Sequence, residues 1–465
     1  MEHQQISKVL RKCRETKSAN TRMNSLLRLS VSRIVAFSAV ILCFFSLADG
    51  SLPQLQMYLL SGNVLTGNIV VKAALLVTAI LGCLIYLRVQ SSGLPLSTWG
   101  LCIVFLIADA AYLIFVRDMS LIDVLQSYNG YYLLLLIGPG LLAFRGAVPE
   151  RAVIICTVFI FAVCAAIGLA QHFAAQPLLY TESSDGSFKV ESWNFFGEVR
   201  AFSLFSSALD FGIFCALCGS LGVALSRTLR VRGTLLFLLS ALACFTTLTR
   251  ICYLVFICAC VYAAVITFGK SARRGRWLPF LYFGLGLSTL WFGLRSFSSG
   301  EDVRLQDATS LIDRIVQWSY YADVIVHASP AQLLFGFGIV QNEKILPRYP
   351  MVIDNVALAL LLHIGLIGLV VFGILMIKMW LYLRREALES QQPFLIAGVS
   401  LWATLACMGI FNIVFSSFGA VFALAILCDK NSSIKQLHTA RNKNNYDEGS
   451  QTKRRSQPFA PVKET

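Results

Sequence analysis

The chain has 465 residues, of which 57% are hydrophobic and only 14% charged, and its mean hydropathy is +0.69. A soluble globular protein carries about 25% charged residues, so this composition excludes an ordinary soluble domain. The apolar residues form runs of about 16–24 residues, the length of a helix that crosses a bilayer. They do not alternate with polar residues in the manner of an outer-membrane β-barrel. The sequence therefore predicts an all-α, polytopic membrane protein.

About twelve transmembrane helices are expected, with a basic tail at each end of the chain. Residues 1–32 and 428–465 are rich in Lys and Arg, which favours a cytoplasmic location for both ends. The expected organisation is a basic N-terminal tail over 1–32, a transmembrane domain over 33–427 and a basic, disordered C-terminal tail over 428–465. The predicted spans are 33–48, 68–87, 98–116, 127–144, 152–171, 203–225, 234–249, 251–269, 278–295, 355–378, 393–409 and 411–427.

The net charge of +14 does not indicate a nucleic-acid partner. Lys and Arg flank the apolar runs and do not line a base-reading element, so the predicted partner is the lipid bilayer. Cys215 and Cys218 lie in an apolar run and are expected to be packing residues, as is His363. The five histidines show no metal-ligand spacing, and no Walker loop, nucleophile elbow or dinucleotide fingerprint occurs. No metal and no cofactor are predicted.

Two loops on the outer side, about 172–200 and 296–354, are too long to be simple connections. In the second loop, apolar residues recur at helical spacing between Ser310 and Pro330, which predicts an amphipathic helix against the outer membrane face. Its apolar stripe consists of Leu311, Ile315, Trp318, Ala322 and Ile325. Functional chemistry concentrates on such loops, so we expect the site on this side.

Four outer arginines occupy positions where a guanidinium group is costly: three of them abut or interrupt apolar spans, and Arg314 lies on the predicted amphipathic helix. They are Arg200, Arg250, Arg295 and Arg314. Each alone is better explained as an interfacial anchor of its helix, because arginine is common at the membrane interface. Together, on a side with few other basic residues, they favour recognition of a phosphate or diphosphate, whose oxygens match the planar fork of arginine.

Acidic residues and histidines near the membrane are the other candidates for chemistry. Asp109 and Asp210 lie in apolar runs and are either proton-relay groups of a transporter or capping and pairing residues. Asp354 opens the tenth predicted span at the outer surface. His172 and His327 lie on the same side and are acid-base candidates.

Four short motifs follow one another on the outer side between residues 200 and 370. They are Arg200-Ala-Phe-Ser-Leu-Phe with Gly212, Thr247-Leu-Thr-Arg250, Arg314-x-x-x-Trp318 followed by Pro330 and Phe335-Gly336-Phe-Gly338, and Asp354-Asn355 followed by Gly365-Leu-Ile-Gly368. In order and placement they resemble the superfamily of O-antigen ligases and O-antigen polymerases of bacterial envelopes. The resemblance implies a GT-C-like glycosyltransferase that acts outside the bacterial cytoplasmic (inner) membrane on a lipid-diphosphate-linked glycan.

Two departures from the family pattern bear on the reaction. Ligases usually carry a histidine before the asparagine where this chain has Asp354-Asn355, and the family's Pro-Asn is replaced by Ser207-Ala208-Leu209-Asp210. The missing histidine fits the polymerases better, because their residue at this point varies more. The expected function is polymerisation of repeat units of O-antigen, capsule or exopolysaccharide, with a flippase and a chain-length regulator as further partners. An O-antigen ligase that transfers glycan to lipid A core is the alternative.

In this interpretation Arg200, Arg250 and Arg314 bind the diphosphate of the polyprenyl-linked donor. They stabilise the negative charge that the leaving group gains as the glycosidic bond breaks, so a metal is unnecessary. Asp354 is the first candidate for the base that accepts the proton of the incoming sugar hydroxyl, and His327 is the second.

Two other classes of protein remain open. A transporter that flips the lipid-linked repeat unit should carry polar residues along both halves of a central cavity, whereas here the costly side chains gather on the outer side. The two halves of the sequence show no matching broken helices, which weakens an inverted-repeat transporter. A non-catalytic scaffold would leave the outer arginines unexplained.

Overall fold

The computed structural model describes residues 96–120, 124, 148–176, 194–195, 198–205, 207–269, 274–282, 284, 288, 320–337 and 356–408. Helices dominate this part of the chain, and two short strands pair antiparallel, with Asn194 opposite Val199 and Phe195 opposite Glu198. The elements are α4 (Leu96–Phe115), α7 (Glu150–Ala174), β1 (Asn194–Phe195), β2 (Glu198–Val199), α8 (Ala208–Leu225), α9 (Arg230–Phe245), α10 (Arg250–Phe268), η2 (Arg274–Arg276), α13 (Pro330–Phe335), α14 (Val356–Ser390) and α15 (Pro393–Met408).

Four of the described helices are long and apolar enough to cross a membrane: α7, α8, α10 and α14. The protein is therefore a mostly helical, membrane-embedded protein, as its composition predicts. The predicted spans 98–116, 152–171, 251–269 and 393–409 coincide within a few residues with α4, α7, α10 and α15. The predicted spans 33–48, 68–87, 127–144 and 411–427 lie outside the described residues, and 278–295 is described only at 278–282, 284 and 288, all helical.

Three helices depart from their predicted boundaries. The span predicted at 203–225 begins only at Ala208, because Ser207 has an extended backbone and its Oγ accepts a hydrogen bond from the Asp210 N–H at 3.1 Å. The span predicted at 234–249 runs from Arg230 to Phe245. The span predicted at 355–378 continues to Ser390, and in its polar last turns Arg385 Nε donates to Glu389 Oε1 at 2.8 Å.

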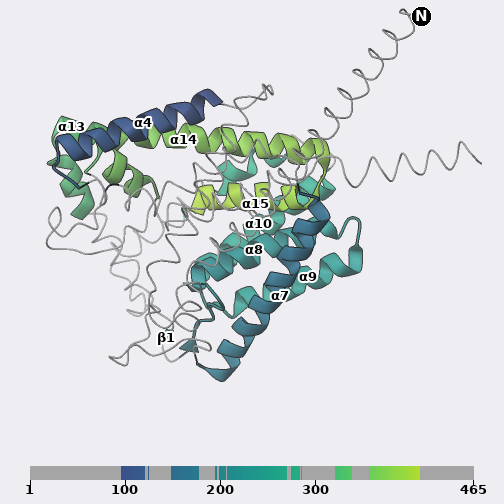
Figure 1. Cartoon of the computed structure of the whole chain (residues 1–465). Helices are drawn as coiled ribbons and strands as arrows, with labels where there is room; N and C mark the ends of the chain where they lie inside the picture. The colour runs from purple at the N-terminus through teal and green to yellow at the C-terminus, as the bar shows by residue number, and fades with distance from the viewer. Residues whose placement is uncertain are drawn as a thin grey trace, which may run out of the picture.

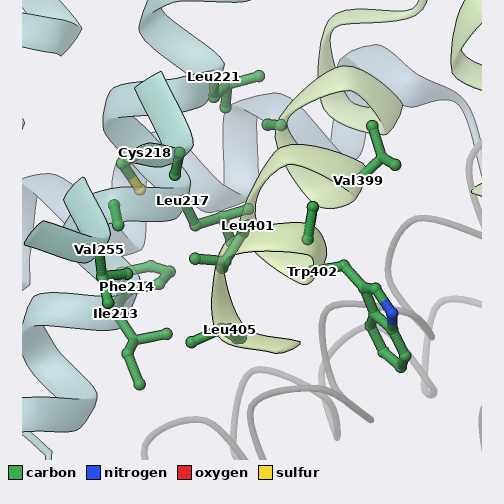
Figure 2. Close-up of a cluster of buried hydrophobic side chains, with 14 of the residues drawn as sticks. Ile213, Phe214, Leu217, Cys218, Leu221, Val255, Val399, Leu401, Trp402 and Leu405 are labelled. Carbon is green, nitrogen blue, oxygen red and sulfur yellow. The ribbon is translucent and has the colours of Figure 1, made fainter. Parts of the chain in front are cut away.

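Helix α8 forms the centre of the fold. It packs against α7, α9, α10 and α15, and α15 lies between α14 on one side and α8 and α10 on the other (Figure 1). Figure 2 shows apolar side chains of α8, α10 and α15 meeting in the core, among them Phe214, Val255 and Leu401. Helices α7 and α8 each contain an apolar window of 18 residues. The buried share of this window is 78% in α8 but only 33% in α7. Helix α7 is therefore less deeply embedded in the protein than α8.

Small residues allow α8 and α10 to approach closely. A Cβ atom at Gly212 would collide with the side chain of Cys252, and one at Gly219 would collide with the ring of Phe256. Close contact through small residues is the usual basis of helix association in membranes, where lipid tails are as apolar as the helices.

Helix α14 bends at Gly365, whose φ of 67° lies in the left-handed region. The residues after α13 pack against this bend. Gly336 there has a φ of 86°, and the Phe337 N–H donates to the Leu362 carbonyl at 2.7 Å. The interrupted helix thus recovers a backbone hydrogen bond inside the protein, as membrane-embedded backbone requires. Two of the glycine-containing motifs singled out by the sequence are therefore in contact with each other. His363, beside the bend, is buried as predicted.

The predicted amphipathic helix is described only from residue 320 onward. Residues 320–326 are helical, and Tyr321 is fully buried against Ala359 and Leu362 of α14. Ala322, a member of the predicted apolar stripe, is exposed. The buried face of this helix therefore lies one residue before the predicted stripe, at Tyr321. Pro330 does not end this helix but opens α13, where Ser329 and Gln332 form a capping box.

Candidate functional site

Arg200 and Arg250 come together at one end of the helix bundle, where α7 and α9 finish and α8 and α10 begin; we call this the Arg200 end. The Ala201 N–H donates to the Thr246 carbonyl at 3.0 Å, which joins the segment after β2 to the turn between α9 and α10. Arg200 is half-buried and Arg250, the first residue of α10, is exposed. Burial lowers the pKa of the Arg200 guanidinium, and the positive charge of Arg250 acts in the same direction. Two of the three predicted diphosphate-binding arginines are thus neighbours.

The buried side chain of Gln171, near the end of α7, holds the backbone that follows Arg200. Its Oε1 accepts hydrogen bonds from the N–H groups of Phe202 at 3.2 Å and Ser203 at 2.7 Å, and its Nε2 donates to the Ser203 carbonyl at 3.1 Å. Ser203 has a φ of 56°, and its Oγ donates to the Cys164 carbonyl at 2.6 Å. Gln171 is therefore a positioning residue for Arg200. Sequence reasoning missed it, although an amide at the end of an apolar run was a visible signal.

The threonines before Arg250 shape the turn that presents it. Thr246 Oγ1 donates to the Ala243 carbonyl at 2.8 Å, Thr247 Oγ1 to the Cys244 carbonyl at 2.7 Å, and Thr249 Oγ1 to the Thr247 carbonyl at 2.8 Å. Leu248 between them has a φ of 48°. The hydroxyls of the Thr-Leu-Thr-Arg motif therefore stabilise a tight turn, and this turn places the arginine at the start of α10.

A carboxylate lies at the same end of the bundle. Asp210 is half-buried in the first turn of α8, and its Oδ2 accepts a hydrogen bond from Ser207 Oγ at 2.7 Å. Asp210 and Arg200 both act electrostatically on the Cys252 thiol, which donates to the Ala208 carbonyl at 3.7 Å. The sequence placed Asp210 inside a span, but the structure places it in the first turn of α8, at the same end of the bundle as the two arginines. His172 is also near, with Nδ1 3.4 Å from the Val199 carbonyl oxygen.

None of the described contacts joins the other predicted site residues to these two arginines. His327 is exposed, and its ring contacts Asp323 of its own helix, 3.3 Å from the carboxylate and 2.9 Å from the carbonyl oxygen. Asp354 and Arg314 lie outside the described residues. Asp109 is fully buried in α4.

Among the described residues, no group of three or more His, Cys, Asp or Glu side chains could hold a metal ion. The cysteines described in this part of the chain are free, and Cys215 and Cys218 are buried in the core, as packing residues would be. A scan against models of known protein families finds no match for this chain, and a search of curated proteins finds none. The resemblance to envelope glycan polymerases and ligases therefore stays a prediction from the four motifs.

Replacing Gln171 with leucine should destabilise the Arg200 end. The substitution leaves the buried N–H groups of Phe202 and Ser203 without their acceptor, at a cost to the free energy of unfolding of about 2 kcal/mol. Thermal unfolding in detergent, followed by a thiol-reactive dye that labels the buried cysteines as they become exposed, measures this cost. Gln176→Leu, at an exposed glutamine, is the matched control. Equal melting temperatures for the two variants would contradict the positioning role.

Proposed function

We propose that this protein is a glycosyltransferase that polymerises lipid-diphosphate-linked oligosaccharide repeat units on the outer face of a bacterial cytoplasmic membrane. The proposal includes a GT-C-like architecture of about twelve transmembrane helices with both chain ends in the cytoplasm. Its main support is the neighbouring position of Arg200 and Arg250 at one end of the bundle, with the first guanidinium half-buried. Two adjacent cations repel each other, so an anion with several oxygens, such as a diphosphate, would stabilise the pair.

The reaction would use these charges in the transition state. The bond between the anomeric carbon of the donor glycan and the diphosphate oxygen breaks, and the electron pair leaves with the diphosphate. Fixed guanidinium groups stabilise that developing charge more than they stabilise the intact donor. An acceptor sugar hydroxyl attacks the anomeric carbon and gives its proton to a general base. Asp354 is our first choice for this base and His327 the second; Asp210 is a further carboxylate, located at the Arg200 end.

The distribution of basic residues supports the proposed orientation. At the end of the bundle opposite Arg200, where α8 and α10 finish and α9 begins, exposed arginines are frequent: Arg227, Arg230, Arg232 and Arg276. Basic residues accumulate on the cytoplasmic side of membrane proteins, so this end would face the cytoplasm. The Arg200 end would then face outward, where lipid-linked repeat units are polymerised.

The test is the glycan pattern of a strain that carries Asp354→Asn. We expect turnover to fall by about 100-fold, because the amide cannot accept the proton of the acceptor hydroxyl. Single repeat units should then accumulate on their lipid in the outer leaflet, as gel electrophoresis and lipid extraction would show. Asp118→Asn, at an exposed aspartate after α4, is the matched control.

Three other patterns would contradict the proposal in different ways. Long lipid-linked chains would indicate a ligase, and repeat units retained in the inner leaflet would indicate a flippase. An unchanged ladder of chain lengths would remove Asp354 from the mechanism.

A further inference from the structure

A cavity of about 540 Å³ opens at the end of the bundle opposite Arg200, which we call the Arg227 end. It lies where three helices finish: Arg227 follows α8, Val265–Gly269 ends α10, and Arg384 and Leu388 belong to the last turns of α14. Gly275 of η2 and Gln391 complete its wall. Among the described residues that line it, two are charged, and both are arginines: Arg227 and Arg384.

One of these arginines is held in a defined position. Arg227 Nη1 donates to Gln391 Oε1 at 2.7 Å, and Gln391 Nε2 donates in turn to the Leu388 carbonyl at 3.1 Å. Gln391 itself directly follows the last residue of α14 and has a φ of 54°, so the helix ends there. A guanidinium group has five N–H donors, so Arg227 keeps donors for a ligand after this bond is made. Arg384, half-buried on α14, supplies the second positive charge.

The surroundings place this cavity at the level of lipid headgroups. Phe268 at the end of α10 is 59% exposed, and Trp277 and Phe280 just after η2 are 70% and 63% exposed, with their ring centroids 5.8 Å apart. Exposed aromatic residues beside a transmembrane helix mark the membrane–water interface. A positively charged cavity between helices at that depth, next to exposed apolar rings, matches a ligand with an anionic head and an apolar chain.

We propose that the cavity at the Arg227 end binds the phosphate group of a membrane phospholipid, with Arg227 and Arg384 as the phosphate ligands. The bound lipid would tie the ends of α8, α10 and α14 together from the side opposite the proposed glycan site. This proposal requires only that the chain spans a membrane, and it holds whether or not the protein is a glycosyltransferase.

The test uses the full-length protein purified in a non-ionic detergent and titrated with short-chain phosphatidylglycerol, with native mass spectrometry as the readout. Phosphatidylcholine and inorganic phosphate are the comparison ligands. We expect phosphatidylglycerol to bind at least tenfold more tightly than phosphatidylcholine, and millimolar inorganic phosphate not to displace it. Displacement by phosphate, or equal binding of both lipids, would overturn the assignment to an anionic phospholipid.

Substitutions locate the binding site. The double variant Arg227→Gln/Arg384→Gln should lose about 10- to 100-fold in affinity for phosphatidylglycerol, because charge-assisted hydrogen bonds are removed. The matched control, Arg230→Gln/Arg232→Gln, removes two exposed arginines of α9 that do not line the cavity and should bind as the unmodified protein does. An equal loss in the control would show general attraction to a basic surface and would refute the proposal.

A second variant tests the cavity without removing charge. A Cβ atom at Gly275 would meet only Val265 and Ile266 side-chain atoms, at 3.9 and 3.8 Å, so the position accepts a Cβ atom, and because Gly275 lines the cavity a larger side chain there would compete with the ligand for space. Gly275→Leu should therefore abolish lipid binding while the lipid-free protein melts at the same temperature as the unmodified protein. Retained binding in this variant would overturn the proposal.

Discussion

Replacing Arg200 or Arg250 with lysine is expected to reduce repeat-unit polymerisation by about 100- to 1000-fold, the usual effect of removing one group that stabilises transition-state charge. Lysine keeps the positive charge but lacks the planar fork that binds two diphosphate oxygens at once. Lysine should be nearly as harmful as alanine at both positions. Arg250 is exposed, so its loss should leave folding intact, and the effect there reports on function alone.

The measurement is the rate of glycan elongation in membranes supplied with lipid-linked repeat units, normalised to the amount of protein. Arg232→Lys, at an exposed arginine of the opposite end, is the matched control and should keep full activity. If lysine restores most of the activity at both Arg200 and Arg250, the arginines are interfacial anchors and the diphosphate-binding interpretation is wrong.

Gly365→Ala should have the largest effect on stability, about 3 kcal/mol of unfolding free energy. An alanine at a φ of 67° is strained, and its Cβ would collide with the Leu334 carbonyl of α13. The residues after α13 would have to move away from α14, and the hydrogen bond from Phe337 to Leu362 would be lost.

Helix α14 supplies its own control for this substitution. A Cβ at Gly373 would meet no atom within 4 Å, so Gly373→Ala should be neutral or stabilise the helix by up to about 1 kcal/mol. Thermal unfolding with a thiol-reactive dye compares the two variants in the same protein preparation. Similar melting temperatures for Gly365→Ala and Gly373→Ala would mean that the bend at Gly365 does not contribute to the stability of the fold.

The helices that the sequence predicted well are those whose limits depend on local composition. The apolar runs at 152–171 and 251–269 correspond to α7 and α10, because hydropathy and helix propensity act over neighbouring residues. The start of α8 could not be located in this way. The predicted span began at residue 203 because Leu204 and Phe205 continue the apolar run, but Gln171 on another helix holds the backbone of Phe202 and Ser203 in a turn through buried hydrogen bonds.

In the candidate site, too, local sequence pattern identified some residues and missed others. The sequence identified Arg200 and Arg250 as costly charges at the membrane edge, since the cost of placing a guanidinium in an apolar run is readable from position alone. It did not identify Gln171, and it assigned Asp210 to the interior of a span. The roles of both residues depend on the turn before α8, which the distant side chain of Gln171 holds together with the local Ser207 cap.

By itself, the sequence determined that this is a helical membrane protein, and it singled out a few arginines at positions where burial of their charge is costly. Only the tertiary structure decided which distant segments meet: Ala201 with Thr246, Gly336 with the backbone at His363, and Arg227 with Gln391. The physical reason is that hydropathy and propensity are properties of consecutive residues. Close contact between distant segments depends instead on small side chains that admit a neighbour and on buried polar groups that must find partners.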